Sequence, residues 1–195
     1  MKLGLSGGIG CGKSTVGRLF AELGWKRLDS DEIVREILNQ DSAVHEAVKT
    51  RWGSGAITTD QSLDRAYIAQ QVFHNQAELR WWEGVLHPRV REIWQGALAA
   101  EPERNWLIEI PLLFENDLES HFDFTICVEA DQETQLRRLA VKGLDREQSL
   151  SRINNQLPVL AKVKRADYVL SNAGSLEFLK RQVGRLSGLL QSAPQ

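Results

Sequence analysis

Apolar residues follow two periodicities that alternate along the chain. Short apolar runs have the length of buried strands, and stretches with helical spacing separate them. After the first run, for example, Val16, Leu19, Phe20 and Leu23 recur at helical spacing, and Gly24 follows as a C-terminal cap. This alternation predicts an α/β domain with a parallel five-stranded sheet. The predicted strands are 3–5, 25–28, 106–110, 124–128 and 168–170.

One long stretch between the second and third predicted strands is almost wholly helical in pattern. It is interrupted only by a glycine turn at 53–55 and by Pro88, which fits the first turn of a new helix. Trp81 and Trp82 are adjacent, so a helix can bury only one of them fully; the other lies at the rim of the core or lines a cleft. The pattern predicts a helical subdomain of about 41–100.

Composition narrows the class of protein. A chain of 195 residues suffices for one α/β domain with a small insertion. The 24 Lys and Arg residues against 26 Asp and Glu residues give a net charge of -2, so we expect no nucleic-acid partner. The absence of a secretory segment or long apolar run predicts a cytoplasmic protein without a membrane partner. The two cysteines, Cys11 and Cys127, do not suggest a disulfide framework.

A glycine-rich segment follows the first predicted strand and opens the first predicted helix. It matches G-x-x-x-x-G-K-[ST], with Gly7 and Gly12 as the two glycines and Lys13 and Ser14 closing the pattern. Glycines let successive amides turn around a phosphate, and the helix begins there with its own unpaired donors. A flexible turn before an ordinary helix is the simpler alternative. The strand and helix on either side favour a loop that binds a nucleoside triphosphate.

Side-chain chemistry assigns roles within this loop. Lys13 would place its charge between the β- and γ-phosphates, Ser14 would offer its hydroxyl to Mg²⁺, and Thr15 would reach the α-phosphate. Cys11 occupies a variable position and is more simply a space-filling residue.

Two carboxylates follow the second predicted strand, at Asp29 and Asp31. Ligands of open α/β sheets gather at the carboxyl ends of the strands, so this pair is predicted to face the same crevice as the phosphate loop. Either Asp29 or Ser30 could instead cap the following helix.

A cationic cluster surrounds Gly143 and is predicted to form a lid of about 137–150. In phosphoryl-transfer enzymes such a segment closes over the phosphates and stabilises the moving charge. A solvated helix end is the alternative. The candidate cations are Arg137, Arg138, Lys142 and Arg146.

Other candidates follow strands or begin helices. Glu109 lies near the end of the third predicted strand, where an acidic residue could approach Mg²⁺, but alternation along a strand could equally turn it to a neighbouring helix, so no metal role is assigned. Leu112 and Leu113 form either a wall of the acceptor pocket or part of the core. Asn172 and Gly174 either approach an adenine ring or form a turn with a helix cap.

In family order, these segments resemble one family, the dephospho-coenzyme A kinases, which are P-loop kinases related in fold to the nucleoside monophosphate kinases. The resemblance implies a three-layer α/β/α fold and transfer of the γ-phosphoryl group of ATP to the ribose 3′-hydroxyl of dephospho-coenzyme A. It implies a core of 1–40, 104–136 and 166–190, an acceptor-binding insertion at 41–100 and the lid. The segments that carry it are Gly4–Val16, Asp29–Asp31, Leu63–Arg65, His87–Pro88, Pro111–Glu115, Arg152–Ile153 with Gln156, and Ala166–Gly174.

The same resemblance implies the site residues. Asp31 would orient or deprotonate the acceptor hydroxyl, with Lys13 and Arg138 as the other catalytic groups. Ser14 and Asp29 would support Mg²⁺. The implied acceptor-binding residues are Asp29, Asp31, His87, Leu112 and Leu113, and the implied ATP-binding residues are Gly8, Gly10, Cys11, Gly12, Lys13, Ser14, Thr15, Arg138, Asn172 and Gly174.

Two features depart from the family pattern. The usual Asp-Ala-Asp is Asp29-Ser30-Asp31, and Lys142 stands where the lid usually carries an arginine. Three alternatives remain: another P-loop kinase for a small molecule or nucleotide, a GTPase, for which the chain lacks Asn-Lys-x-Asp, and a regulatory nucleotide-binding module, against which the two carboxylates argue.

Overall fold

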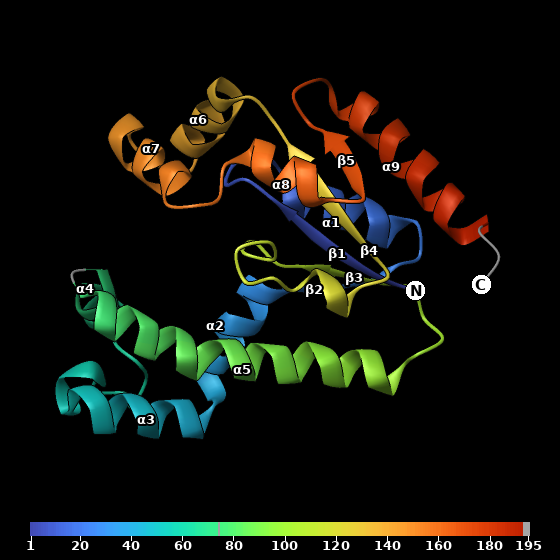
Figure 1. Cartoon of the computed structure of the whole chain (residues 1–195). Coiled ribbons are helices and arrows are strands. Elements are labelled where there is room, and N and C mark those ends of the chain that lie inside the picture. Colours follow the sequence, from blue (N-terminus) through green and yellow to red (C-terminus); the bar gives the residue numbers. More distant parts are fainter. Residues whose placement is uncertain (74, 193–195) are drawn as a thin grey trace. The chain divides into compact units, whose positions relative to one another are not determined.

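The computed structural model describes residues 1–73 and 75–192 and divides into two compact units (Figure 1). The sheet unit comprises Met1–Asp29 and Glu101–Gln195, and the helical unit comprises Ser30–Ala100. The helical unit therefore begins at Ser30, earlier than the boundary near residue 41 expected from the sequence.

The sheet unit is built on five parallel strands in the order β2-β3-β1-β4-β5, which confirms the predicted sheet. Leu5 of β1 and Asp29 of β2 are both in register with Glu109 of β3. Three neighbouring strands thus bring their carboxyl ends to one edge. The strands are β1 (Lys2–Gly7), β2 (Lys26–Asp29), β3 (Trp106–Glu109), β4 (Phe124–Glu129) and β5 (Tyr168–Ser171).

Helices cover both faces of this sheet, giving the predicted three layers (Figure 1). On one face α1 (Lys13–Glu22) and α9 (Leu176–Ser192) pack against each other over a core that includes Leu3, Leu5 and Leu179. On the other face α8 (Val159–Arg165) packs against β1 and β4. The remaining helices of the unit are η2 (Glu119–His121), α6 (Gln132–Val141) and α7 (Arg146–Asn154).

The segment after β3 packs closely beneath β1. A Cβ at Gly4 would lie 2.6 Å from Leu113 Cδ1 and 2.8 Å from Phe122 Cδ2, so only glycine fits there. Leu113 is fully buried, as the core interpretation of this residue expected.

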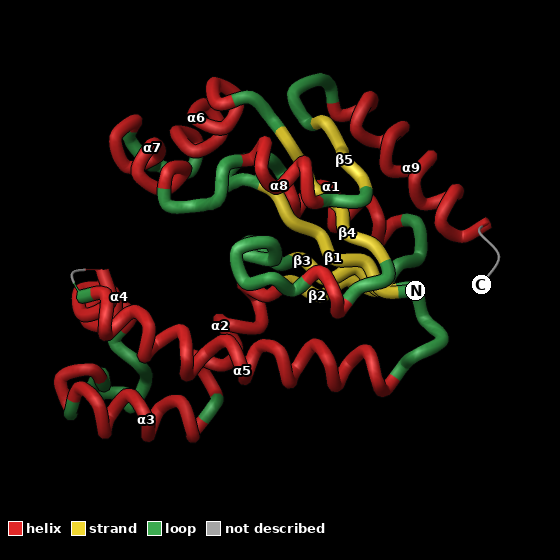
Figure 2. Tube along the Cα trace, viewed as in Figure 1, coloured by secondary structure: helices red, strands yellow, loops and turns green. Residues whose placement is uncertain are grey.

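The helical unit consists of helices joined by loops (Figure 2). Within its described residues, Ile57 and Leu63 form an isolated β-bridge. Trp82 is buried and Trp81 is partly exposed, as expected for one core and one rim residue, and both rings contact Trp52. The helices are α2 (Ser30–Gln40), α3 (Ser42–Trp52), η1 (Ser54–Ala56), α4 (Arg65–Phe73) and α5 (Gln76–Ala100).

The predicted helix break at Pro88 is wrong, because Pro88 lies inside the continuous helix α5. A proline inside a helix costs about 3 kcal/mol. Leu86 and Val90 on either side are buried, as are Trp94 and Leu98 further along, so packing of this apolar stripe offsets the lost hydrogen bond.

Candidate active site

The segment Gly7–Gly12 has backbone angles that require glycine. Gly10 and Gly12 have φ values of 77° and 95°, and Gly12 is the N-cap of α1. A Cβ at Gly7 would lie 2.3 Å from the carbonyl oxygen of Val128, and one at Gly12 would lie 2.2 Å from Asn172 Nδ2. The loop is therefore seated tightly between β4 and the segment after β5.

Two predicted ATP-binding residues hold the loop from outside. Asn172 Nδ2 donates to the carbonyl oxygen of Cys11 at 2.7 Å, and Arg138 Nη1 donates to the carbonyl oxygens of Gly10 and Cys11, both at 3.2 Å. Arg138 Nη2 also donates to the carbonyl oxygen of Asn172 at 2.8 Å. Arg138 and Asn172 are thus brought together against the loop, and Gly174 lies nearby in sequence in an exposed turn.

Lys13 and Ser14, the first residues of α1, make different contacts. The Lys13 ammonium donates to the carbonyl oxygens of Gly7 and Gly8 at 3.2 and 3.3 Å, which places its charge over the loop. Ser14 Oγ donates to Glu109 Oε1 at 3.2 Å. Thr15, the other predicted phosphate contact, is partly exposed.

Glu109 belongs to a charged cluster that the sequence did not reveal. Arg27 Nη2 donates to Asp29 Oδ2 at 2.7 Å and to Glu109 Oε2 at 3.0 Å, so one guanidinium bridges the two carboxylates. Gly17 makes room for this arrangement, because a Cβ there would lie 2.5 Å from Arg27 Nε. Burial raises the pKa of Glu109, the Arg27 hydrogen bond opposes the shift, and the charge of Asp29 adds to it.

The cluster offers oxygen donors of the kind that Mg²⁺ prefers. Ser14 supplies a hydroxyl, and Asp29 and Glu109 supply carboxylates. No group of three or more His, Cys, Asp or Glu residues able to hold a metal occurs in the described part of the chain.

Neither Arg27 nor the placement of Glu109 could be found from the sequence. Arg27 carries no motif, and the pairing of Asp29 with Glu109 depends on the strand order, in which β3 lies between β1 and β2. The available signal was Glu109 at the end of an apolar strand.

The remaining acceptor candidates differ in exposure. Asp31 lies in the first turn of α2 and is exposed. His87 is exposed on α5, where it lines a hollow of about 330 Å³ with Pro88, Arg91, Glu92 and Gln95. In the sheet unit, Leu112 is partly exposed, whereas Leu113 lies in the core.

The cationic residues of the predicted lid fall into two groups. Arg138 is half-buried against the loop, while Arg137, Lys142 and Arg146 are exposed. A capping box between Asp145 and Gln148 begins α7. The predicted lid therefore comprises the end of α6, a connecting turn and the start of α7.

Cys11 and Cys127 are both buried and free, as expected. Burial raises the pKa of the Cys127 thiol to about 12 and also raises that of Cys11, so both behave as small apolar residues at neutral pH.

None of the helices in the described residues is long and apolar enough to cross a membrane.

The family model for dephospho-CoA kinase matches residues 1–177. The chain belongs to the dephospho-CoA kinase family. A dephospho-CoA kinase of Gloeobacter violaceus is 40% identical over 184 residues, which cover 94% of this chain and 89% of that protein.

Two solved structures share the fold of this chain. A crystal structure of a protein from Thermus thermophilus is 35% identical, with a TM-score of 0.85 over 100% of this chain and 98% of that one. A dephospho-CoA kinase from Campylobacter jejuni has a TM-score of 0.73 over 97% of this chain and 98% of that one; at 23% identity it supports the fold.

Proposed function

We infer that this chain transfers the γ-phosphoryl group of ATP to the 3′-hydroxyl of the ribose of dephospho-coenzyme A, giving coenzyme A and ADP, the final step of coenzyme A synthesis. The observation that carries the inference is a phosphate-binding loop within a chain that matches one family of kinases over residues 1–177. The loop accounts for the donor, and the family match accounts for the acceptor.

The proposed ATP site is built on the phosphate-binding loop and the residues that contact it. Amides of Gly8, Gly10 and Gly12 and the N-terminus of α1 bind the phosphates, with the buried Cys11 filling space within the loop and Thr15 reaching the α-phosphate. Lys13 stabilises the charge that develops on the transferred group, and Arg138, Asn172 and Gly174 complete the nucleotide site.

Mg²⁺ would be held by Ser14 and Asp29, with Glu109 as a further carboxylate. When bound, the ion neutralises phosphate charge and fixes the triphosphate for in-line transfer. Arg27 bridges these two carboxylates, and Ser14 donates to Glu109.

Asp31 is the central residue of the proposed acceptor site. Its carboxylate orients the ribose hydroxyl and accepts its proton, a role that typically contributes ~10²–10⁴-fold to the rate. Asp29, His87, Leu112 and Leu113 are the other proposed acceptor residues, with Leu113 acting through its support of Leu112 because it is buried. A closing lid at about 137–150 would exclude water from the transferred phosphate.

The partners are ATP and dephospho-coenzyme A. A net charge of -2 gives no general attraction to nucleic acid or to an anionic membrane surface. The proposed place of action is the cytoplasm.

Release of ADP by the purified protein tests this function, with dephospho-coenzyme A, AMP, CMP and shikimate as separate acceptors. We expect turnover with dephospho-coenzyme A alone, and none in the Lys13→Met variant, which controls for contaminating kinases. Equal rates with another acceptor would overturn the substrate assignment.

A further inference from the structure

Ile9, in the middle of the phosphate loop, has both of its backbone polar groups held by glutamine side chains. Gln135 Nε2 donates to the Ile9 carbonyl oxygen at 2.6 Å, and Gln156 Oε1 accepts from the Ile9 amide at 3.0 Å. We call this pair the Ile9 clamp. Gln135 comes from α6 and Gln156 from the segment before α8, so the clamp residues lie on either side of the predicted lid in the chain.

Residues of α6 and α8 also pack closely against the glycines on either side of Ile9. A Cβ on Gly10 would lie 3.1 Å from the Gln135 carbonyl oxygen, and one on Gly8 would lie 2.7 Å from both Gln135 Nε2 and Val159 Cγ2. Gln135 is only 3% exposed. The loop is therefore wedged between these helices rather than suspended in solvent.

The clamp determines where the next amide points. The Ile9–Gly10 peptide is trans, so its carbonyl oxygen and the Gly10 N–H point in opposite directions. Because Gln135 holds the carbonyl outward, the Gly10 N–H faces the other side of the loop. Arg138 and Asn172 do the same for the Cys11 carbonyl and hence for the Gly12 N–H. Amides fixed in this way need no reorganisation when an anion arrives.

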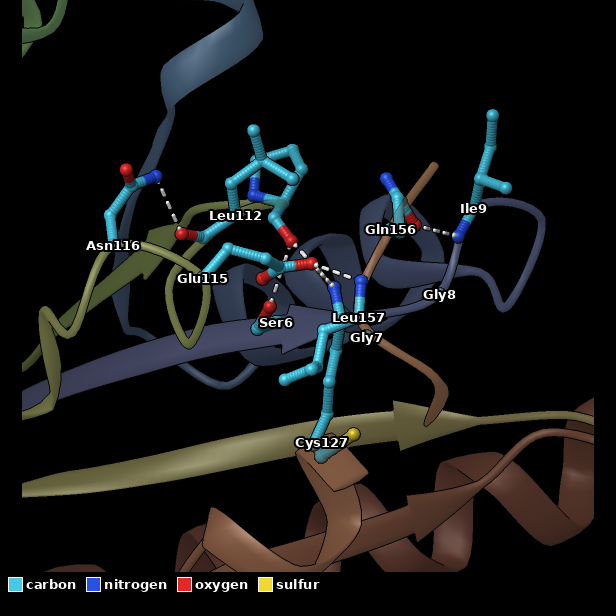
Figure 3. Close-up of polar contacts among 12 residues, drawn as sticks. Ser6, Gly7, Gly8, Ile9, Leu112, Glu115, Asn116, Cys127, Gln156 and Leu157 are labelled. Atoms are coloured by element: carbon cyan, nitrogen blue, oxygen red, sulfur yellow. Dashed lines mark hydrogen bonds and ion pairs between the residues drawn. The ribbon is translucent and has the colours of Figure 1, made fainter. Parts of the chain in front are cut away.

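A buried ion pair secures the Gln156 side of the clamp (Figure 3). Glu115 Oε1 accepts from the Leu157 amide at 3.0 Å and from Lys162 Nζ at 2.7 Å. Lys162 is fully buried and also donates to the Pro111 carbonyl oxygen at 3.0 Å. Ser6 Oγ, one residue before the loop, donates to the same carbonyl oxygen at 3.1 Å. The segment after β3, the start of α8 and the end of β1 are thus tied together.

We propose that Gln135 and Gln156 are positioning residues that hold the phosphate loop in its anion-binding form and couple it to the lid segment between them, with Glu115 and Lys162 anchoring Gln156. The coupling to a lid rests on the proposed function. The preorganisation of the loop does not, because it concerns nucleotide binding alone.

The two glutamines face opposite backbone groups, which gives a sharp test. A glutamate can replace Gln156, because it still accepts from the Ile9 amide, but it cannot replace Gln135, whose partner is a carbonyl oxygen. Both substitutions add one negative charge beside the same residue, so Q135E and Q156E control for each other's charge. Gln132→Glu, on the exposed start of α6, is a further charge control.

The measurement is the Kd for ADP and for a non-hydrolysable ATP analogue by titration calorimetry, with Tm recorded for each variant. We expect Q135E to weaken binding at least tenfold, and Q156E and Q132E to stay within about threefold of wild type. If Q135E is not folded, Gln135→Met replaces it, and the same weakening is expected. Equal Kd values for Q135E and Q156E would overturn the clamp.

Kinetics separate the clamp from the substrate assignment. Q135E should raise KM for ATP and leave KM for dephospho-coenzyme A within about twofold. If wild type does not phosphorylate dephospho-coenzyme A but the Kd pattern holds, the proposed function falls and the clamp stands. If wild type turns over and both variants bind nucleotide like wild type, the clamp falls alone.

Discussion

The candidate functional residues of the sheet unit and of the helical unit lie in different surroundings. In the sheet unit Lys13, Ser14, Arg138 and Asn172 each have partners at named distances, and the loop they serve is wedged in place. In the helical unit Asp31 and His87 are exposed on helix surfaces. The difference matches two tasks: a triphosphate is bound by a rigid set of amides and charges, whereas an acceptor hydroxyl needs one correctly oriented carboxylate.

The largest effect on kcat is expected at Asp31, the residue that the proposed function makes the proton acceptor. Asp31→Asn should lower kcat by ~10²–10⁴-fold, because an amide cannot take the hydroxyl proton. The Kd for ATP and the Tm should stay near wild-type values. Steady-state kinetics with dephospho-coenzyme A measure the first quantity, and Glu32→Gln, the adjacent acid on α2, is the control. An unchanged kcat would assign the proton transfer to another group.

At Lys162, in contrast, the main effect should be on the free energy of unfolding. Lys162→Met removes the charge partner of Glu115, whose side chain is only 19% exposed, and such a loss should cost about 1–3 kcal/mol of the free energy of unfolding. Urea unfolding measures this loss. Lys164→Met, on the exposed side of the same helix, should change stability by less than about 0.5 kcal/mol. Similar values for both variants would mean that the ion pair adds nothing.

Substitution of Gly17 tests whether Arg27, which bridges Asp29 and Glu109, leaves room for a side chain at this position of α1. An alanine in a helix is normally more stable than a glycine by about 1 kcal/mol. Gly184→Ala in α9, where nothing lies within 4 Å of the added Cβ, should show that gain. Gly17→Ala should instead destabilise the protein, because its Cβ meets Arg27. Thermal unfolding of the two variants decides the point, and a gain at both positions would contradict the bridge.

A smaller effect concerns the pH dependence of stability at Glu109. The pKa of Glu109 is raised above its ordinary value of 4.5, mainly by burial. Protonation of Glu109 therefore stabilises the folded state. This contribution to the free energy of unfolding is fully present below pH 4.5 and is lost as the pH rises through the raised pKa. Glutamine does not ionise, so Glu109→Gln removes this pH dependence. The free energy of unfolding of wild type should fall relative to that of the variant as the pH rises above 4.5. Urea unfolding between pH 4 and pH 8 measures the difference, and the opposite slope would contradict the assignment.

The sequence predicted what depends on local pattern. The five strands, the loop of Gly7–Gly12 and the role of α1 all follow from periodicity and spacing over a few tens of residues. It could not predict contacts that depend on strand order, such as Arg27 between Asp29 and Glu109. It also misjudged Pro88, where burial of the surrounding stripe outweighs a local rule.

Some residues that the sequence singled out make contacts that it did not foresee. Gln156 was noted as part of a family pattern, yet its bond to Ile9 spans most of the chain. Arg138 was expected to meet phosphates, and its three hydrogen bonds go to carbonyl oxygens of the loop and of Asn172. Such contacts arise only when distant segments pack together, so single-sequence periodicity carries no trace of them.

A crystal structure of the protein with a non-hydrolysable ATP analogue, Mg²⁺ and dephospho-coenzyme A tests the central claim most directly. The account predicts β- and γ-phosphates against the amides of Gly10 and Gly12, with the ribose 3′-hydroxyl within hydrogen-bond distance of Asp31. A triphosphate bound away from the loop, or a 3′-hydroxyl that faces a different carboxylate, would contradict it.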